Sequence, residues 1–138
     1  YKLSIYRPSI YGPSVGVLGW HHESPLGIGI HPEFGTWFAY RVVIAANTQF
    51  AATQLVTPPP CAACLDKPCV ANCPASAVKA AFPFNLESCR TERLREAGQC
   101  QLACFARSAC PVGKQYQYHK AQLNYHYGHS LDSIKRIQ

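Results

Sequence analysis

The apolar residues of this chain occur in short runs that are separated by proline, glycine and serine. Runs at residues 15–18 and 28–30 predict short strands between turns. The longest apolar segment, residues 36–47, is rich in aromatic and β-branched side chains, which favours a buried strand. The amino-terminal part is therefore expected to be rich in strands and loops.

Three later segments show helical features. Alanine and valine recur at helical spacing in residues 68–78, and acidic and arginine residues alternate in residues 86–97, with Gly98 placed where a helix would stop. Residues 112–127 predict a third helix, which Gly128 would end. Between these segments and the amino-terminal part lie three consecutive prolines that end regular structure before the first cysteine.

Composition adds a limit on the core and on the partners. The chain has 138 residues, of which 48% are apolar and only 14% are charged, so it predicts one domain with a modest core that a covalent or metal link would help to stabilise. No apolar run reaches the length of a membrane span. The net charge of +6 is spread along the chain, which favours an ordinary basic surface over a nucleic-acid site and leaves an acidic protein partner open.

Eight cysteines, all within residues 61–110, are the most informative feature. The first four have the spacing C-x2-C-x4-C-x3-C-P, and each half of the cysteine region ends in Cys-Pro, as an internal duplication would produce. The cysteines are Cys61, Cys64, Cys69, Cys73, Cys89, Cys100, Cys104 and Cys110.

Disulfides, zinc and iron–sulfur clusters are the three explanations for so many cysteines in a short chain. Only one Cys-x2-Cys pair is present, whereas zinc sites often use two, and nothing in the sequence indicates secretion. A cubane cluster needs one thiolate for each of its four irons, and a short loop can supply three of them while a distant cysteine supplies the fourth. The spacing therefore favours two [4Fe–4S] clusters.

The order of the eight cysteines resembles that of bacterial dicluster ferredoxins. More closely, it is similar to the ferredoxin-like module of the epoxyqueuosine reductase and reductive dehalogenase families. Residues 29–41, GIHPEFGTWFAYR, look like the stretch that precedes the clusters in those enzymes, and the similarity covers residues 24–115. Small stand-alone ferredoxin-like proteins of proteobacteria share the ending Ala-Cys-Pro-Val-Gly.

This resemblance implies an α+β fold with a ferredoxin-like dicluster core at residues 58–113. Residues 1–57 would form a strand-rich segment packed on the core, and residues 114–138 a helical tail. It also implies a crossed assignment of the cysteines, in which each cluster takes ligands from both halves. The first quartet would be Cys61, Cys64, Cys69 and Cys110, and the second quartet Cys73, Cys89, Cys100 and Cys104.

The chain departs from the family pattern at three points. Four residues separate Cys64 from Cys69 where the usual motif has two, a spacing that resembles the iron–sulfur subunits of molybdoenzyme reductases. The gaps on either side of Cys104, three and five residues, are unusual too. The 60 residues before Cys61 are too few for a cobalamin-binding domain, so epoxyqueuosine reduction by this chain alone is not expected.

Other residues have a chemical and an ordinary interpretation. Charged residues near the cysteines would tune the potential of a cluster or simply face solvent; these are Asp66, Lys67, Lys79, Arg90 and Arg107. His31 with Glu33 would act as an acid–base pair or cap a turn, and His21-His22 would bind metal or lie at the surface. Trp37, Phe38 and Tyr40 would stack on a cofactor or form core.

The tail mixes aromatic and basic side chains, which suits docking onto the cluster domain or a larger complex better than binding single-stranded nucleic acid. Its residues are Tyr116, Tyr118, His119, Lys120, Tyr125, His126, Tyr127 and His129.

The sequence therefore predicts an electron-transfer protein that carries two [4Fe–4S] clusters between redox partners. No catalytic residues are legible, so an enzymatic role is not favoured. The alternatives are an iron–sulfur subunit of a larger oxidoreductase complex, a fragment-like relative of a tRNA-modifying or corrinoid-dependent reductase, and a zinc-stabilised scaffold. Because free thiolates need a reducing compartment, bacterial cytoplasm or an organelle matrix is the expected location.

Overall fold

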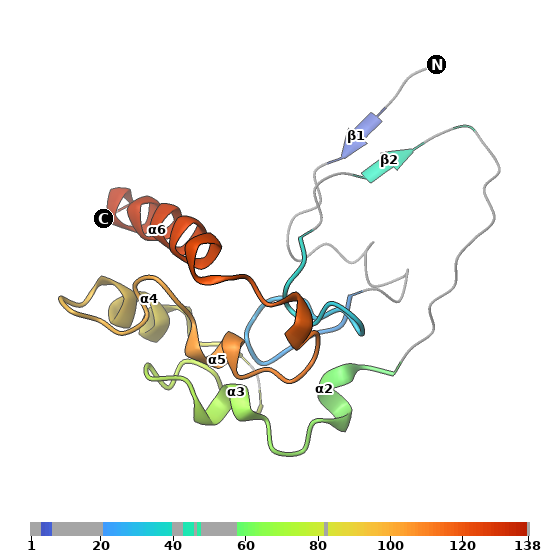
Figure 1. Cartoon of the computed structure of the whole chain (residues 1–138), viewed down its shortest axis with the longest axis horizontal. Helices are drawn as coiled ribbons and strands as arrows, with labels where there is room; N and C mark the ends of the chain where they lie inside the picture. The colour runs from blue at the N-terminus through green and yellow to red at the C-terminus, as the bar shows by residue number, and fades with distance from the viewer. Residues whose placement is uncertain are drawn as a thin grey trace.

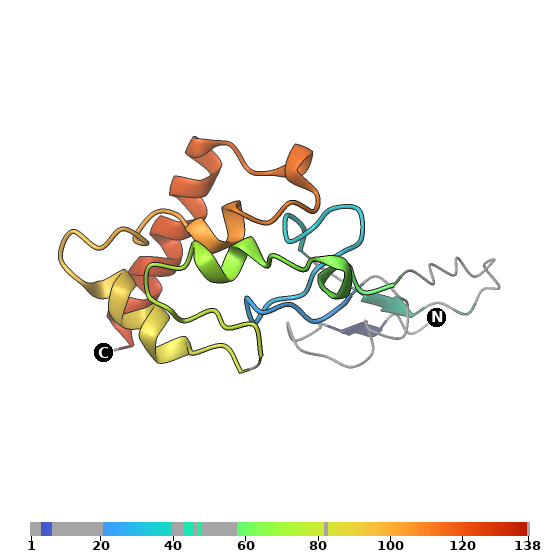
Figure 2. The same ribbon diagram turned by 90° about the horizontal axis from the view of Figure 1, so that it is seen from below.

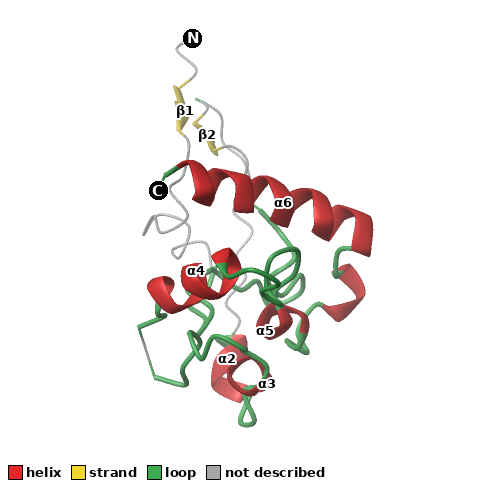
Figure 3. Ribbon diagram, turned by 90° about the vertical axis from the view of Figure 1, so that its left-hand side faces the viewer, coloured by secondary structure: helices red, strands yellow, loops and turns green. Residues whose placement is uncertain are grey.

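The computed structural model describes residues 4–6, 21–39, 43–45, 47, 58–81 and 83–137. Within these residues short helices joined by loops make up most of the chain (Figures 1 and 3). The elements, in chain order, are β1 (Ser4–Tyr6), β2 (Val43–Ala45), α2 (Pro60–Ala63), α3 (Pro68–Ala71), α4 (Leu86–Leu94), α5 (Phe105–Ser108), the 3-10 helix η1 (Lys114–Tyr116) and α6 (Lys120–Arg136).

The two strands form an antiparallel pair in which Ile5 lies opposite Ile44. In Figure 1 this pair lies on the other side of the molecule from α4 and the end of α6. Of the strand expected at residues 36–47, Val43–Ala45 is strand, residues 36–39 are loop, and parts of the rest lie outside the described residues. Most of residues 1–57 are also outside them, so the α+β, ferredoxin-like fold stays a prediction.

The helices of the cysteine region are short because prolines set where they begin and nearby residues set where they end. Proline occupies the first turn of α2 and of α3, where its missing N–H is not needed. The helix expected at residues 68–78 ends after Ala71, since the Asn72 side chain donates to Pro68 O (2.9 Å) and Ser76 has a φ of 49°.

Helix α4 begins at the expected position because the Asn85 side chain accepts a hydrogen bond from Ser88 N (2.9 Å). It ends after Leu94, earlier than expected, because Arg95 leaves the helical conformation with a ψ of 135°.

The helix expected at residues 112–127 is wrong in both of its ends. Gly113 has a left-handed φ of 67°, so η1 forms there as a separate turn. Helix α6 begins only after His119, whose Nδ1 accepts from Gln122 N (3.3 Å), and it continues through Gly128 to Arg136. Gly128 lowers helix stability but does not end this helix.

A small buried cluster of Leu26, Val78 and Ala106 joins the amino-terminal loop to the cysteine region. Helix α3 packs against α5, and α4 packs against α6. Figure 2 shows α3 and α5 side by side, with α6 behind them. The core of the described residues therefore lies between the segments that carry cysteines.

The loop at residues 21–39 is held against the end of the cysteine region by close backbone contact. It contains the antiparallel bridges His22↔Ile30 and His31↔Gly35. A Cβ atom on Gly35 would lie 2.0 Å from Val112 O, and one on Gly113 would lie 2.4 Å from Phe34 O. Only glycine fits at these two positions, both of which also have positive φ.

Candidate cluster sites

The first quartet is brought together from three short segments. Cys61 lies in α2, Cys64 ends that helix, Cys69 lies in α3, and Cys110 follows α5. All four line one small apolar cavity of about 20 Å³, together with Pro25 and Ile30 from the amino-terminal loop. Lys67, which has a left-handed φ of 39°, also lines the cavity from the loop between Cys64 and Cys69.

The thiols of this quartet lie near enough to affect each other. Burial raises the pKa of Cys61 to about 11, and repulsion from Cys110, Cys69 and Cys64 adds to the effect, while Lys67 opposes it. Burial also raises the pKa of Cys69, again with Cys110 as the next cause. Without a bound cation these thiols would be protonated at neutral pH, as expected of ligands that lose protons when metal binds.

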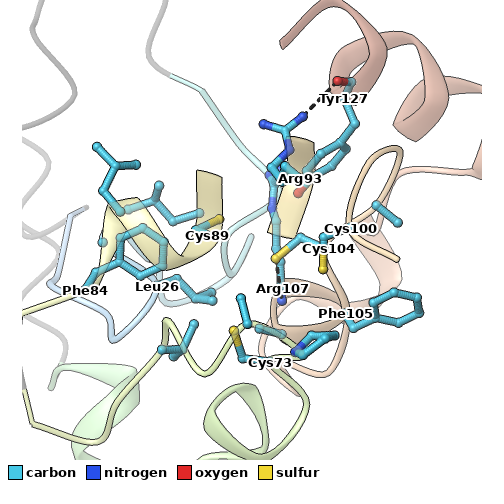
Figure 4. Close-up of a pocket in the computed structure, with 18 of the residues that line it drawn as sticks. Leu26, Cys73, Phe84, Cys89, Arg93, Cys100, Cys104, Phe105, Arg107 and Tyr127 are labelled. Carbon is cyan, nitrogen blue, oxygen red and sulfur yellow. Dashed lines mark hydrogen bonds between the residues drawn. The ribbon is translucent and has the colours of Figure 1, made fainter. Parts of the chain in front are cut away.

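The second quartet lines a separate, larger cavity of about 630 Å³ (Figure 4). Cys73 follows α3, Cys89 lies in α4, Cys100 lies in the loop after it, and Cys104 is the N-cap residue of α5. Because Leu86 is 71% and Phe105 45% exposed, one side of this cavity opens to solvent.

The pKa shifts in the second quartet have the same causes. Burial raises the pKa of Cys100 to about 11, and the Cys104, Cys73 and Cys89 thiols are among the groups that raise it further. The pKa of Cys89 is raised by burial and then by Cys104, whereas the nearby Arg93 lowers it. The cysteines that raise the pKa of Cys61, Cys69, Cys89 and Cys100 thus belong in each case to the same quartet as the affected thiol.

Helices α3 and α5 connect the two sites. The segment of α3 supplies Cys69 to the first cavity and Cys73 to the second, and the segment of α5 supplies Cys104 to the second and Cys110 to the first. Since the two helices pack against each other, each site takes ligands from both halves of the cysteine region. These two sets of cysteines are the ones that the family resemblance paired, although their binding to clusters stays a prediction.

The two cavities differ in the room that they offer a bound group. The second cavity is roomy, whereas the first holds about one water-sized sphere. A [4Fe–4S] cube does not fit into the first cavity at that volume, so the segments around it would have to move apart to hold one. Among the described residues no three His, Cys, Asp or Glu side chains converge as a single metal ion requires.

Arg93 is a buried cation in the lining of the second site. Its side chain is only 8% exposed and lines the cavity, yet no carboxylate pairs with it among the described residues. Its Nε has no hydrogen-bond partner within the same part of the chain. A buried cation without a counter-ion is costly, and an anionic cluster bound by thiolates would offset that cost.

Of the charged residues near the cysteines, Arg107 is the one most firmly placed. Its guanidinium donates to Thr36 O and lies 4.3 Å from the ring centre of the buried Trp37. Its backbone N–H donates to Cys104 Sγ (3.4 Å). Trp37 is therefore core, and Arg107 joins the amino-terminal loop to the second site.

His31 and Glu33 do not form an acid–base site. Nδ1 of His31 accepts from Glu33 N (3.0 Å) and Phe34 N (3.2 Å), so the ring caps a turn. The Glu33 carboxylate accepts instead from Tyr116 O–H (2.8 Å), which ties this loop to η1. His22 takes part in the backbone bridge to Ile30, and Tyr40 lies outside the described residues.

Several tail residues contact the protein itself. The Tyr118 ring lies 5.3 Å from Trp37, and Tyr127 faces the second cavity. Leu131 is 6% exposed and anchors α6, whereas Tyr125 is 64% exposed. Docking of the tail onto the cysteine region is thus what the described residues show.

Arg93 is the site residue that sequence reasoning missed. The signal for it was present, because it follows Cys89 by four residues in the expected helix and so shares its face. Tyr127 was expected only as one of several docking residues of the tail, since its place in the second cavity depends on how α6 packs on α4.

None of the described helices has the length and apolar character needed to cross a membrane. Comparison of the chain with protein-family models, with curated proteins and with solved structures found no match. Its function must therefore be inferred from the arrangement of its own residues.

Proposed function

We propose that this chain is an electron-transfer protein that holds two [4Fe–4S] clusters, one on each quartet. The observation that carries the proposal is the sorting of eight cysteines into two cavities by four thiols each. Four thiolates per site is the donor number of a cubane cluster, and such clusters supply one-electron chemistry when bound.

The residues around the sites support this role by what they do to the ligands. The backbone N–H of Arg107 donates a hydrogen bond to Cys104 Sγ (3.4 Å). Apolar side chains such as Leu26 and Ile30 keep water from the inner faces of the cavities. Hydrogen bonds and limited solvent access are the means by which proteins set cluster potentials.

The shared helices suit transfer between the two sites. The α3 segment runs from Cys69 at one cavity to Cys73 at the other, a separation of four residues. Cys69, Val70 and Cys73 of this segment pack against the buried Leu26–Val78–Ala106 cluster. An electron could therefore pass from one site to the other without a further cofactor.

A subunit of a larger oxidoreductase complex is the second candidate. Several large apolar side chains are mostly exposed, which favours a protein partner; they are Leu65 (89%), Ile137 (79%) and Leu86 (71%). Leu65 lies between two ligands of the first quartet, so a partner that covers it would come close to that site. Co-purification with larger subunits would favour this candidate over a free carrier.

Anaerobic purification with metal and sulfide analysis tests the proposal. About eight irons and eight acid-labile sulfides per chain are expected, with a broad visible absorption that dithionite bleaches. A colourless chain, or one that contains zinc or disulfides, would overturn the electron-transfer role.

A further inference from the structure

Arg93 makes contacts that fix its guanidinium beside the second quartet. Nη1 donates to Ser130 Oγ (2.9 Å) and Nη2 donates to Tyr127 O (2.9 Å), both on α6. The third group, Nε–H, is buried and has no partner among the described residues. Figure 4 shows the end of the Arg93 side chain pointing toward Tyr127. Because Arg93 is four residues from Cys89 on one helix, its charge stays near that ligand.

Tyr127 brings a neutral donor to the same site. Its side chain lines the second cavity together with Cys104 and Arg107, and the centre of its ring lies 5.4 Å from the Arg93 guanidinium carbon. A hydroxyl beside a ligand can orient its dipole toward the negative charge of a cluster. The Cys104 sulfur accepts a hydrogen bond from Arg107 N (3.4 Å).

The first quartet lacks comparable side-chain partners within the described residues. Lys67 is the cationic side chain that lines its cavity. The two sites therefore differ in the charged and hydroxyl side chains that surround their thiols.

We propose that Arg93 and Tyr127 raise the reduction potential of the cluster at the second quartet, an inference that rests on the proposed function. Reduction adds one electron to an already anionic cluster, and a nearby cation and a neighbouring hydroxyl dipole both stabilise the added charge. The two residues are positioning residues that act through Cys89 and Cys104. They also attach α6 to α4, so a purely structural role is the alternative to be excluded.

The test is a potentiometric titration, followed by EPR, of the anaerobic full chain with both clusters bound. Tyr127→Phe removes one hydroxyl and keeps both the ring and the carbonyl that holds Arg93. Loss of the hydroxyl dipole beside the ligands is expected to make reduction about tenfold less favourable, which lowers one of the two potentials by about 59 mV. Arg93→Gln is expected to lower the same potential further.

Two matched variants serve as controls. Tyr125→Phe removes a hydroxyl from the same helix at a side chain that is 64% exposed, and Arg90→Gln removes a charge from α4 outside the second cavity. Both controls should leave both potentials unchanged. A Cys61→Ser chain that keeps only the second cluster identifies which potential has moved.

The outcomes separate this inference from the proposed function. Absence of iron from the wild-type chain would overturn the proposed function and this inference with it. Two bound clusters whose potentials do not change in Tyr127→Phe would overturn the inference alone. Should Arg93→Gln fail to fold, the Tyr127→Phe result decides, because that variant leaves the Arg93 contacts in place.

Discussion

Replacing Gly35 with alanine tests the close contact between the amino-terminal loop and the first quartet. Gly35 has a φ of +59°, which costs an alanine about 1–2 kcal/mol. Its Cβ would lie 2.0 Å from Val112 O, a backbone atom that cannot rotate away, and such overpacking costs about 1–3 kcal/mol. Alanine also restricts the unfolded chain more than glycine does, and this offsets about 0.4–1 kcal/mol of the lost stability.

We therefore expect Gly35→Ala to lower the free energy of unfolding by about 2–4 kcal/mol, a large share of the stability of an ordinary domain. Val112 adjoins the Cys110–Pro111 pair that lines the first cavity, so movement of its carbonyl also disturbs that site. The variant should lose cluster from the first quartet before the second. Iron content would then fall from about eight toward about four per chain.

The assay is thermal unfolding followed by circular dichroism under argon, at one scan rate, together with iron analysis. The apparent Tm of Gly35→Ala should fall by on the order of 10 °C. Gly128→Ala is the matched control, because Gly128 lies inside α6 and its Cβ would meet only Leu102 Cδ2 at 3.8 Å. The free energy of unfolding of this control should rise by about 0.5–1 kcal/mol. Equal stability of Gly35→Ala and wild type would refute the reasoning.

Three further predictions follow from the helices and the thiols. Leu131→Ala should cost about 2–3 kcal/mol and increase hydrogen exchange throughout α6, because Leu131 is the buried anchor of that helix. Asn85→Ala should lower the free energy of unfolding, measured in urea, by about 1 kcal/mol because the α4 cap is lost, whereas Asn85→Asp should leave it unchanged because aspartate also caps helices. In the cluster-free chain the pKa values of Cys61 and Cys100 are raised from 9.0 to about 11. The unfolded state therefore loses these protons at a lower pH than the folded state does. The free energy of unfolding should consequently fall as pH rises from 9 through 11. An increase over that range would contradict the burial of these thiols.

Local sequence signals predicted the elements whose causes are local. The start of α4 at Leu86 agrees with the prediction, because Asn85 caps the helix there, and α3 begins at the expected Pro68. Helix α2 begins at Pro60, where the sequence predicted that the prolines end regular structure, because proline is tolerated in the first turn of a helix. The grouping of cysteines was reached only through a family resemblance, since spacing alone does not say which distant cysteine completes a site.

Long-range packing explains what the sequence did not reveal. Gly128 looks like a helix stop, but α6 continues because Leu131 beyond it is buried. The roles of Arg93 and Tyr127 arise where α6 docks on α4, a contact between residues 34 apart in the chain. Gly113 separates η1 from α6 through a positive φ that no composition pattern indicates.

The crossed arrangement of the two sites is the central claim, and iron content of two double variants tests it most directly. Cys69→Ala/Cys110→Ala removes two ligands of one quartet, although they are distant in sequence. Cys69→Ala/Cys73→Ala removes neighbours in sequence that belong to different quartets. The account expects the first variant to retain about four irons and the second to retain almost none. The reverse result, with about four irons in the second variant and almost none in the first, would mean that each cluster takes its ligands from consecutive cysteines and would contradict the account.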